Sequence, residues 1–249
     1  MSEQPYLRMH CSPGVQEGPR KGGLNKVCSL LYWPVSCYRR YVHLYRRKKS
    51  KFLSKNYDYK FASWNIRTLI DREETDRPER RTALVAKELD RYGVDIAGLS
   101  ETRLSDENHL IEVGAGFTFF WKGKPAGVKR EGGVGFAIKS TLVDLIEQPC
   151  AFSDRIMTLR LALSAKRYIT IISAYAPTMT NDEETIISFY TLLSSVISEI
   201  PKSDKILLLG DFNARVGQDN DTWDCLGPYG IGKTVCICCS YVHNLIFPS

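Results

Sequence analysis

Polar side chains stand at the ends of three short apolar runs in the sequence, where they can do chemistry. Asn65 ends the first run and Glu101 directly follows the second. Asp211 and Asn213 follow the third run. Because carboxylates are rarely buried without a partner, acidic residues at strand ends are typical of a metal or catalytic site at one edge of a sheet. Each residue taken alone is better explained as part of a turn or a cap, so the prediction depends on their occurring together.

The types of these residues indicate phosphate chemistry. Glu101 is suited to hold a hard divalent ion such as Mg²⁺, which takes one or two carboxylates together with water and phosphate oxygens. A hydrolase also needs a group that orients the attacking water, and Asp211 is the natural candidate. Asn213, Asn65 and Tyr175 can donate hydrogen bonds to a phosphate as charge builds up on it.

The local sequence predicts the strands and helices that position these residues. Strands are expected where apolar residues alternate or run continuously between turn residues, over Tyr59–Asn65, Val94–Ser100, Phe117–Trp121, Gly133–Lys139, Ile156–Leu163, Tyr168–Tyr175 and Lys205–Gly210. The spacing of apolar residues predicts one helix that Pro78 opens and Gly93 ends, and a second over Ile186–Ile200 that Pro201 stops.

Basic residues are concentrated at the amino-terminal end of the 249-residue chain. Residues 1–60 carry 13 Lys and Arg against three Asp and Glu, whereas the remainder carries 21 against 25. Residues 1–56 lack a helical or strand period, so we expect a mostly disordered basic leader that can be deleted without loss of the fold. The leader is either a solvated linker with a nuclear-import patch at Arg46–Lys51, which is the favoured interpretation, or an arm that binds nucleic acid.

Composition argues against a membrane protein and against a disulfide-stapled secreted module. No stretch approaches the ~18 consecutive apolar residues that a membrane span requires. The eight cysteines fall in uneven clusters that do not suggest a disulfide framework. We therefore expect an intracellular location, which the import patch would make nuclear.

Short motifs give the sequence a family resemblance. It resembles the endonuclease/exonuclease/phosphatase superfamily in four motifs that occur in the family's order, at Ser63–Arg67, Leu99–Thr102, Ala174–Pro177 and Gly210–Asn213. It is similar to the apurinic-type endonuclease domain of RTE-type LINE retrotransposons, and to their domesticated relatives, at Gly132–Ile138, Ser153–Arg160 and Gly210–Gly217. The resemblance covers about Tyr57 to Gly232.

This resemblance implies a fold, a reaction and a set of roles. The fold is an α/β, DNase I-like four-layer sandwich of two packed mixed β-sheets flanked by helices, and the reaction is Mg²⁺-dependent hydrolysis of DNA phosphodiester bonds. The resemblance implies that Glu101 and Asn65 hold the metal and that Tyr175 holds the phosphate. It implies that Asp211 orients or activates the attacking water and that Asn213 stabilises the transition state. Arg155 would contact the DNA backbone.

The sequence departs from the family after its last matching motif. The family's motif order ends in an Asp-His pair, and no such pair follows Asn213, since His243 has no adjacent Asp. We therefore expect an incomplete domain over residues 57–232, with the last strands missing and an atypical tail over residues 233–249. On this basis nicking should be weak or absent, and Asp211→Ala should change little. The alternative function is a non-catalytic derivative that binds nucleic acid or a protein partner.

One segment of the sequence also matches the consensus pattern of a nucleotide-binding motif. Gly227–Thr234 fits the Walker A pattern G-x-x-x-x-G-K-T, but a working P-loop needs a buried strand before it and a helix after it. Residues Gln218–Asp224 are polar, and Val235–Cys239 makes a poor first helical turn. ATP binding is therefore not expected. A phosphoinositide or sphingomyelin phosphatase of the same superfamily is disfavoured by the retroelement-like sequence of Gly210–Gly217.

Overall fold

The structure is a computed structural model that describes residues 58–71, 80–164 and 166–213, together with the backbone of three amino-terminal strands, Leu7–Met9, Lys26–Leu31 and His43–Arg46. The expectations for the Walker-like motif, for His243 and for the tail over residues 233–249 lie outside the described residues.

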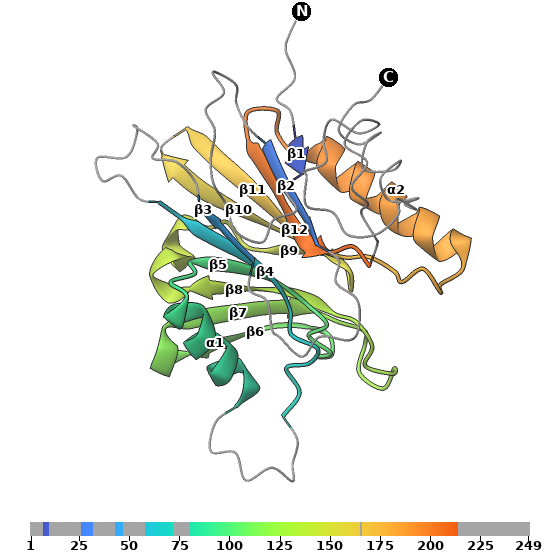
Figure 1. Cartoon of the computed structure of the whole chain (residues 1–249), viewed down its shortest axis with the longest axis horizontal. Helices are drawn as coiled ribbons and strands as arrows, with labels where there is room; N and C mark the ends of the chain where they lie inside the picture. The colour runs from blue at the N-terminus through green and yellow to red at the C-terminus, as the bar shows by residue number, and fades with distance from the viewer. Residues whose placement is uncertain are drawn as a thin grey trace, which may run out of the picture.

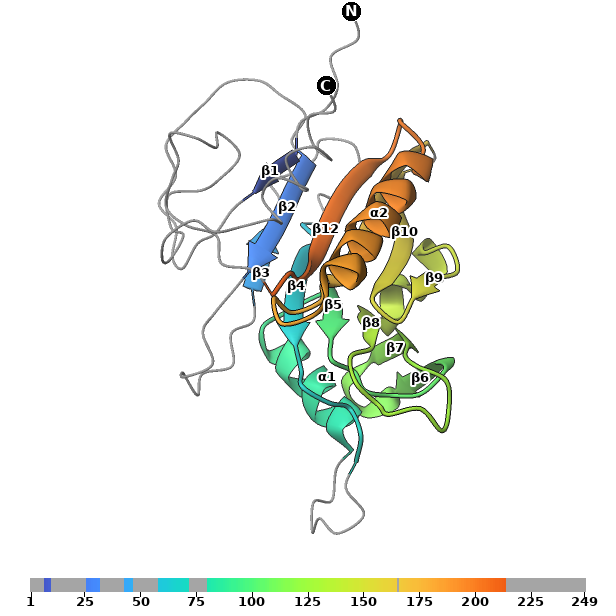
Figure 2. The ribbon, with the colours of Figure 1, turned by 90° about the vertical axis from the view of Figure 1, so that its right-hand side faces the viewer.

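Two six-stranded mixed sheets pack face to face, and one helix covers the outer side of each (Figures 1 and 2). The first sheet has the order β1-β2-β12-β11-β10-β9, with β1 Leu7–Met9, β2 Lys26–Leu31, β9 Cys150–Ser153, β10 Ile156–Ser164, β11 Arg167–Tyr175 and β12 Lys205–Asp211. The second sheet has the order β3-β4-β5-β8-β7-β6, with β3 His43–Arg46, β4 Lys60–Asn65, β5 Ile96–Ser100, β6 Glu107–Glu112, β7 Phe117–Lys122 and β8 Val134–Lys139. The expected four-layer α/β sandwich is thereby confirmed.

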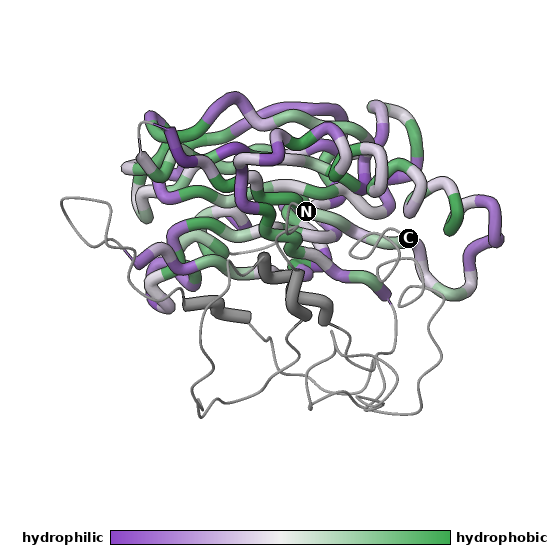
Figure 3. Tube along the Cα trace, turned by 90° about the horizontal axis from the view of Figure 1, so that it is seen from above, coloured by the Kyte–Doolittle hydropathy of each residue, from purple (hydrophilic) through white to green (hydrophobic). Residues whose placement is uncertain are grey.

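The layer between the sheets is apolar and buried. It is formed by inward-facing residues of both sheets, among them Phe61, Ile96, Phe136, Ile138, Met157, Leu159, Leu161, Ile171, Leu207 and Leu209. Hydrophobic stretches accordingly run through the strands in Figure 3, and hydrophilic residues gather toward the turns. Since successive side chains of a strand point to opposite faces, this burial fixes the register of each strand against the opposite sheet.

Helix α1, Arg81–Arg91, covers the outer face of the second sheet. Its buried residues Thr82, Ala86 and Leu89 recur at helical spacing and pack with the outward-facing residues of β4, β5 and β7. Gly93, at φ 63°, takes the left-handed conformation after the last turn, as expected for a residue that ends a helix. Because α1 covers its outer face, all of β5 is buried.

Helix α2, Glu183–Glu199, lies along the outer face of the first sheet (Figure 2). Asp182 caps its first turn, where the Thr185 amide donates to Asp182 Oδ1 at 2.7 Å. The residues that α2 buries are Ile186, Phe189, Tyr190, Leu193 and Val196. No helix among the described residues is long and apolar enough to cross a membrane.

The elements expected from the sequence are present with shifts of a few residues at their ends. Strands β6 and β9 were not expected from the sequence. β6 is an edge strand whose residues are mostly polar and exposed, so it lacks a hydrophobic period. β9 spans four residues, which is too short for a pattern to stand out.

Three short strands lie within the segment expected as a leader. β2 pairs in parallel with β12, and β3 pairs antiparallel with β4. Both β12 and β4 therefore have a partner on the side away from β11 and β5. The division of the chain between residues 56 and 57 stays a prediction.

Two parallel strand pairs decide where the site forms. β4 is parallel to β5, with Asn65 opposite Ser100, and β11 is parallel to β12, with Tyr175 opposite Asp211. The carboxyl ends of parallel strands meet at the same edge of a sheet. The strands that carry the candidate residues therefore end together.

Candidate active site

Asn65 joins the two carboxylates of the site. Its Nδ2 donates to Glu101 Oε1 at 2.8 Å and to Asp211 Oδ2 at 2.9 Å. Asn65 and Glu101 belong to the second sheet, whereas Asp211 ends β12 of the first. The expectation that Glu101 and Asp211 lie together is therefore met, and the site spans the gap between the sheets.

Glu101 has two further partners. The Tyr175 hydroxyl donates to Glu101 Oε1 at 3.3 Å, and Arg103 Nη2 donates to Glu101 Oε2 at 3.2 Å. Arg103 was not among the residues singled out from the sequence. Its position two residues after the candidate metal ligand is the signal that could have identified it, because the turn after β5 brings its side chain back beside Glu101.

Asn213 binds the ends of β12 and β11 together. Its backbone amide donates to Asp211 Oδ1 at 3.0 Å, and its Nδ2 donates to the Ala176 carbonyl at 2.7 Å. Asn213 thus holds Asp211 in place and lies beside the strand end that carries Tyr175. Its role toward a transition state stays a prediction.

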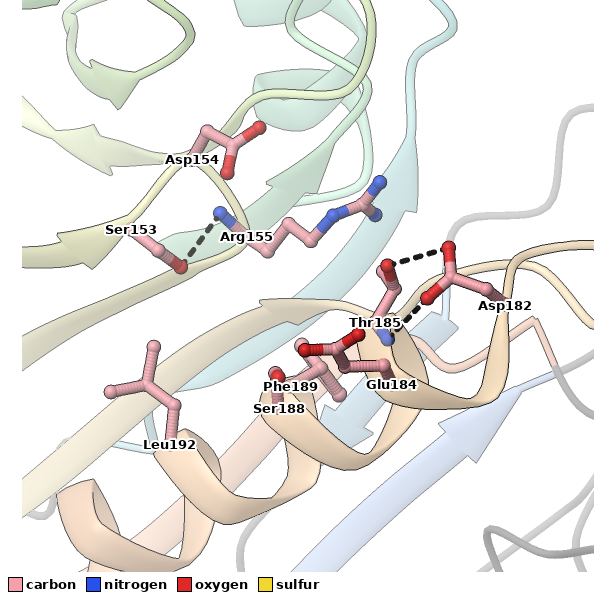
Figure 4. A pocket seen from close by; sticks show the side chains of 9 residues that line it. All are labelled: Ser153, Asp154, Arg155, Asp182, Glu184, Thr185, Ser188, Phe189 and Leu192. Carbon is pink, nitrogen blue, oxygen red and sulfur yellow. Dashed lines mark hydrogen bonds between the residues drawn. The ribbon is translucent and has the colours of Figure 1, made fainter.

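Arg155 connects the site to a neighbouring pocket. Its Nη1 donates to the Tyr175 carbonyl at 3.2 Å, and its guanidinium carbon lies 5.2 Å from the centre of the Tyr175 ring. The pocket has a volume of about 360 Å³ and lies between the β9–β10 turn and α2, where Arg155 extends over it in Figure 4. The pocket is lined by Ser153, Asp154, Arg155, Asp182, Glu184, Thr185, Ser188, Phe189 and Leu192.

The backbone is strained where the site strands end. Arg67, Glu101 and Asn213 have φ values of 63°, 57° and 46°, in the left-handed region that non-glycine residues rarely adopt. Each follows one of the strands β4, β5 and β12. Such strain costs ~1–3 kcal/mol per residue and tends to occur at functional sites. Arg103 and Asp106, in the loop after Glu101, have positive φ values of 55° as well.

Two glycines line the Glu101 side of the site. Gly132 and Gly133, at φ 78° and 86°, accept hydrogen bonds from the amides of Arg103 and Thr102 at 2.9 and 3.2 Å. A Cβ atom at Gly133 would collide with the Thr102 side chain, and one at Gly132 would lie 3.5 Å from Tyr175 Cε1. The absence of side chains at Gly132 and Gly133 therefore lets the loop before β8 pack against Thr102 and Tyr175, which lie beside Glu101.

Burial and charge shift the acidity of two site residues. Burial raises the pKa of the Asp211 carboxyl, and the charge of Glu101 adds to the increase, while hydrogen bonds from Asn65 and the Asn213 amide oppose it. Burial, followed by the charges of Glu101 and Asp211, raises the pKa of Tyr175 to about 12. The tyrosine hydroxyl is therefore a neutral hydrogen-bond donor at physiological pH.

The donor set of the site fits a magnesium-type ion. No cluster of three or more His, Cys, Asp or Glu side chains that could hold a metal occurs in the part of the chain that the structure describes. Mg²⁺ does not require such a cage, since it is usually bound by one or two carboxylates and keeps several waters. Glu101 is a carboxylate of this kind, and the side-chain amide of Asn65 lies beside it, hydrogen-bonded to Glu101 and to Asp211.

A two-sheet α/β sandwich with carboxylates and amides gathered at the ends of its central strands is the arrangement of the DNase I-like domains. The chain belongs to the endonuclease/exonuclease/phosphatase family, whose sequence profile matches residues 62–231, more than half of its length. The family resemblance drawn from the motifs is thereby confirmed, and the matched range contains every candidate site residue.

The chain is similar to a mammalian protein and, at low identity, to two solved structures. Craniofacial development protein 2 of Tragulus javanicus is 26% identical over 182 residues, which cover 70% of this chain but 28% of that protein. This chain thus spans less than a third of that relative. D. rerio TDP2 complexed with single strand DNA product has a TM-score of 0.42 at 16% identity, covering 66% of this chain and 63% of that one. The endonuclease domain of TRAS1, a telomere-specific non-LTR retrotransposon, has a TM-score of 0.40 at 16% identity, covering 64% and 60%.

Proposed function

We propose that this domain hydrolyses phosphodiester bonds of DNA with the help of a divalent metal ion, Mg²⁺. The observation that carries the proposal is the double hydrogen bond of Asn65 to Glu101 and Asp211. These bonds bring a carboxylate suited to a metal ion and a half-buried carboxylate of raised pKa to one point, where strands of both sheets end. Family membership supports the same reaction class.

Each residue of the site has a distinct task in this proposal. Asp211 accepts a proton from the attacking water, whose oxygen forms a bond to phosphorus while a phosphorus–oxygen bond to one sugar breaks. The raised pKa of Asp211 makes it a stronger base than an exposed aspartate. The neutral Tyr175 hydroxyl, whose one hydrogen is donated to Glu101 in the absence of substrate, would turn to a phosphate oxygen, where negative charge increases in the transition state.

Glu101, with Asn65 beside it, would hold the metal ion. When bound, a divalent ion of this kind supplies positive charge to phosphate oxygens and lowers the pKa of bound water. Arg103 lies beside Glu101 and Arg155 beside Tyr175. In this proposal both cations would contact the phosphates of the DNA strand.

The second candidate function is DNA binding without cleavage. Among residues 58–71, 80–164 and 166–213 the one histidine is His109, which stacks on Phe120 and lies on the edge strand β6, three strands away from β5 and from the site. No Asp-His pair stands at the site among residues 58–71, 80–164 and 166–213. Arg103, Arg155 and the Tyr175 hydroxyl would then bind phosphates without cleavage.

Nicking of supercoiled plasmid DNA separates the two functions. A working hydrolase should convert plasmid to the open-circular form with Mg²⁺ and not with EDTA, in contrast to the weak or absent nicking expected from the missing Asp-His pair. Glu101→Gln should slow nicking by ~10²-fold or more, because a single carboxylate of this kind contributes several kcal/mol through the metal. The matched control is Glu107→Gln on the exposed edge strand β6, which should nick like the unmodified chain. Retained DNA binding with no Mg²⁺-dependent nicking would favour the binding function instead.

A further inference from the structure

The two sheets touch directly at Gly98, in the middle of β5. A Cβ atom at this position would lie 3.1 Å from Leu209 Cβ and 3.2 Å from Ser173 Oγ. Both distances are shorter than the ~3.5–4.0 Å of favourable contacts between non-bonded carbon atoms. Gly98 has no positive φ that would call for glycine. Close approach of the opposite sheet is therefore the reason that glycine fits here.

The contact at Gly98 lies on the strands that carry the site. Gly98 precedes Glu101 by three residues along the chain, and Ser173 and Leu209 each precede a site residue, Tyr175 and Asp211, by two. Because a strand rises ~3.3 Å per residue, the contact lies ~7–10 Å from the site along each strand. Ser173 Oγ also donates to the Leu99 carbonyl at 3.4 Å, which ties the two sheets at the same level.

The site depends on the separation that this contact sets. The hydrogen bond from Tyr175 to Glu101, at 3.3 Å, and that from Asn65 to Asp211, at 2.9 Å, both cross from one sheet to the other. Hydrogen bonds weaken beyond ~3.2 Å, so a displacement of a few tenths of an ångström would break the longer of the two. The Leu209 Cβ is attached to the backbone, so an added atom at residue 98 cannot be accommodated by rotating that side chain.

We propose that Gly98 is a positioning residue, whose missing side chain lets the sheets approach closely enough for Glu101 to meet Tyr175 and for Asn65 to bridge to Asp211. Its effect on rate rests on the proposed function. Its effect on geometry does not, because the hydrogen bonds of Asn65 exist without substrate.

The test uses the side-chain amide signal of Asn65 in ¹⁵N-labelled full-length protein, identified by its loss in Asn65→Ala. In Gly98→Ala the Asn65 signal should shift and its hydrogens should exchange faster with solvent, because the bond to Asp211 lengthens. Where the unmodified chain nicks plasmid, the same variant should be slower by ~10-fold, because a misplacement of about 1 Å costs ~10²-fold and the displacement expected here is a few tenths of an ångström. Ser173→Thr adds a methyl group to the same contact from the opposite sheet and should shift the same signal.

Two controls separate positioning from stability. Gly114→Ala adds a Cβ where no atom lies within 4 Å and should change nothing. Leu142→Ala empties a core site at the end of β8 away from Glu101, and should lower the melting temperature without moving the Asn65 signal.

An unchanged Asn65 signal in folded Gly98→Ala, or in Ser173→Thr should the first variant fail to fold, would overturn the positioning role. A shifted Asn65 signal in a chain that does not nick DNA supports the positioning role and counts against the proposed hydrolase instead.

Discussion

Tyr175 and Asp211 lie directly opposite each other at the carboxyl ends of the parallel strands β11 and β12. Their register places a phenol beside a buried carboxylate, while Glu101 reaches the same phenol from the other sheet. Burial and these two negative charges raise the pKa of Tyr175 to about 12, and burial raises that of Asp211. Folding therefore disfavours the charged forms of both Asp211 and Tyr175, which gives two predictions.

The first prediction is that Asp211→Asn stabilises the protein while it removes activity. A carboxyl whose pKa is raised by folding contributes stability below its unfolded pKa of ~3.9, and this stability is lost as the pH rises through the folded pKa. At pH 7 the charged Asp211 is thus unfavourable, and Asn removes the charge. In EDTA the variant should melt at a higher temperature than the unmodified chain, as measured by circular dichroism. In a separate assay with Mg²⁺, its nicking rate should be ~10²–10⁴-fold lower than that of the unmodified chain. Asp144→Asn, an exposed control at the far end of the sandwich, should change neither measurement; a lower melting temperature for Asp211→Asn would contradict the prediction.

The second prediction concerns the pH dependence of nicking. The rate should rise as Asp211 loses its proton and then stay level into the alkaline range, because Tyr175 keeps its proton until about pH 12. Tyr175→Phe should slow nicking by ~10²–10³-fold, since a hydrogen-bond donor to the transition state is lost. The shape of its pH profile should not change. A falling limb near neutral pH that Tyr175→Phe removes would show that the tyrosine titrates during the reaction.

The third prediction concerns a buried ion pair far from the site. Arg160 binds the fully buried Asp204 through Nε at 2.6 Å and Nη2 at 3.1 Å, and Thr170 donates to the same carboxylate at 3.0 Å. Asp204→Ala should cost ~1–3 kcal/mol in denaturant unfolding, because Thr170 loses its buried acceptor while Arg160, which is 27% exposed, keeps Glu147 as a partner. Glu147→Gln, which removes the exposed partner of the same Arg160, should cost no more than ~1 kcal/mol.

The interaction of Asp204 with Arg160 should also make the free energy of unfolding fall at acid pH. Burial alone would raise the pKa of Asp204, but the hydrogen bonds from Arg160 and Thr170 outweigh it and hold the pKa below its usual value. A depressed pKa contributes stability above the unfolded value of ~3.9, and this stability is lost as the pH falls through the lower folded pKa. Unfolding curves of Asp204→Ala should therefore show a weaker acid dependence than those of the unmodified chain. Equal dependence in both would contradict a depressed pKa.

The fourth prediction concerns residues 1–56. Their deletion should weaken binding to plasmid DNA and flatten its dependence on salt, because fewer Lys and Arg contacts release fewer counterions. It should also lower the melting temperature, since β12 and β4 lose their pairing with β2 and β3. Deleting residues 1–25 is the matched control, because it keeps both of those strands. An unchanged salt dependence would identify the segment as a linker, and an unchanged melting temperature would show that β2 and β3 add no stability.

The sequence alone determined the family, the central strands and the residues at their ends. The apolar runs before Glu101 and Asp211 predict buried strands whatever surrounds them, and the motifs around them are specific enough to indicate their order. A local stretch of sequence carries this information because buried strands show alternating or continuous apolar residues. β6 was not predicted, because its residues are mostly exposed and it therefore lacks an apolar pattern.

The tertiary structure decided how those residues meet. The bridge from Asn65 to Asp211 joins residues 146 positions apart and two different sheets, and no local pattern encodes such a contact. Arg103 and the close contact at Gly98 likewise depend on the approach of the two sheets, which is set by side-chain packing across the interface. The acidity of Tyr175 and Asp211 follows from burial and from charges that only this approach brings together.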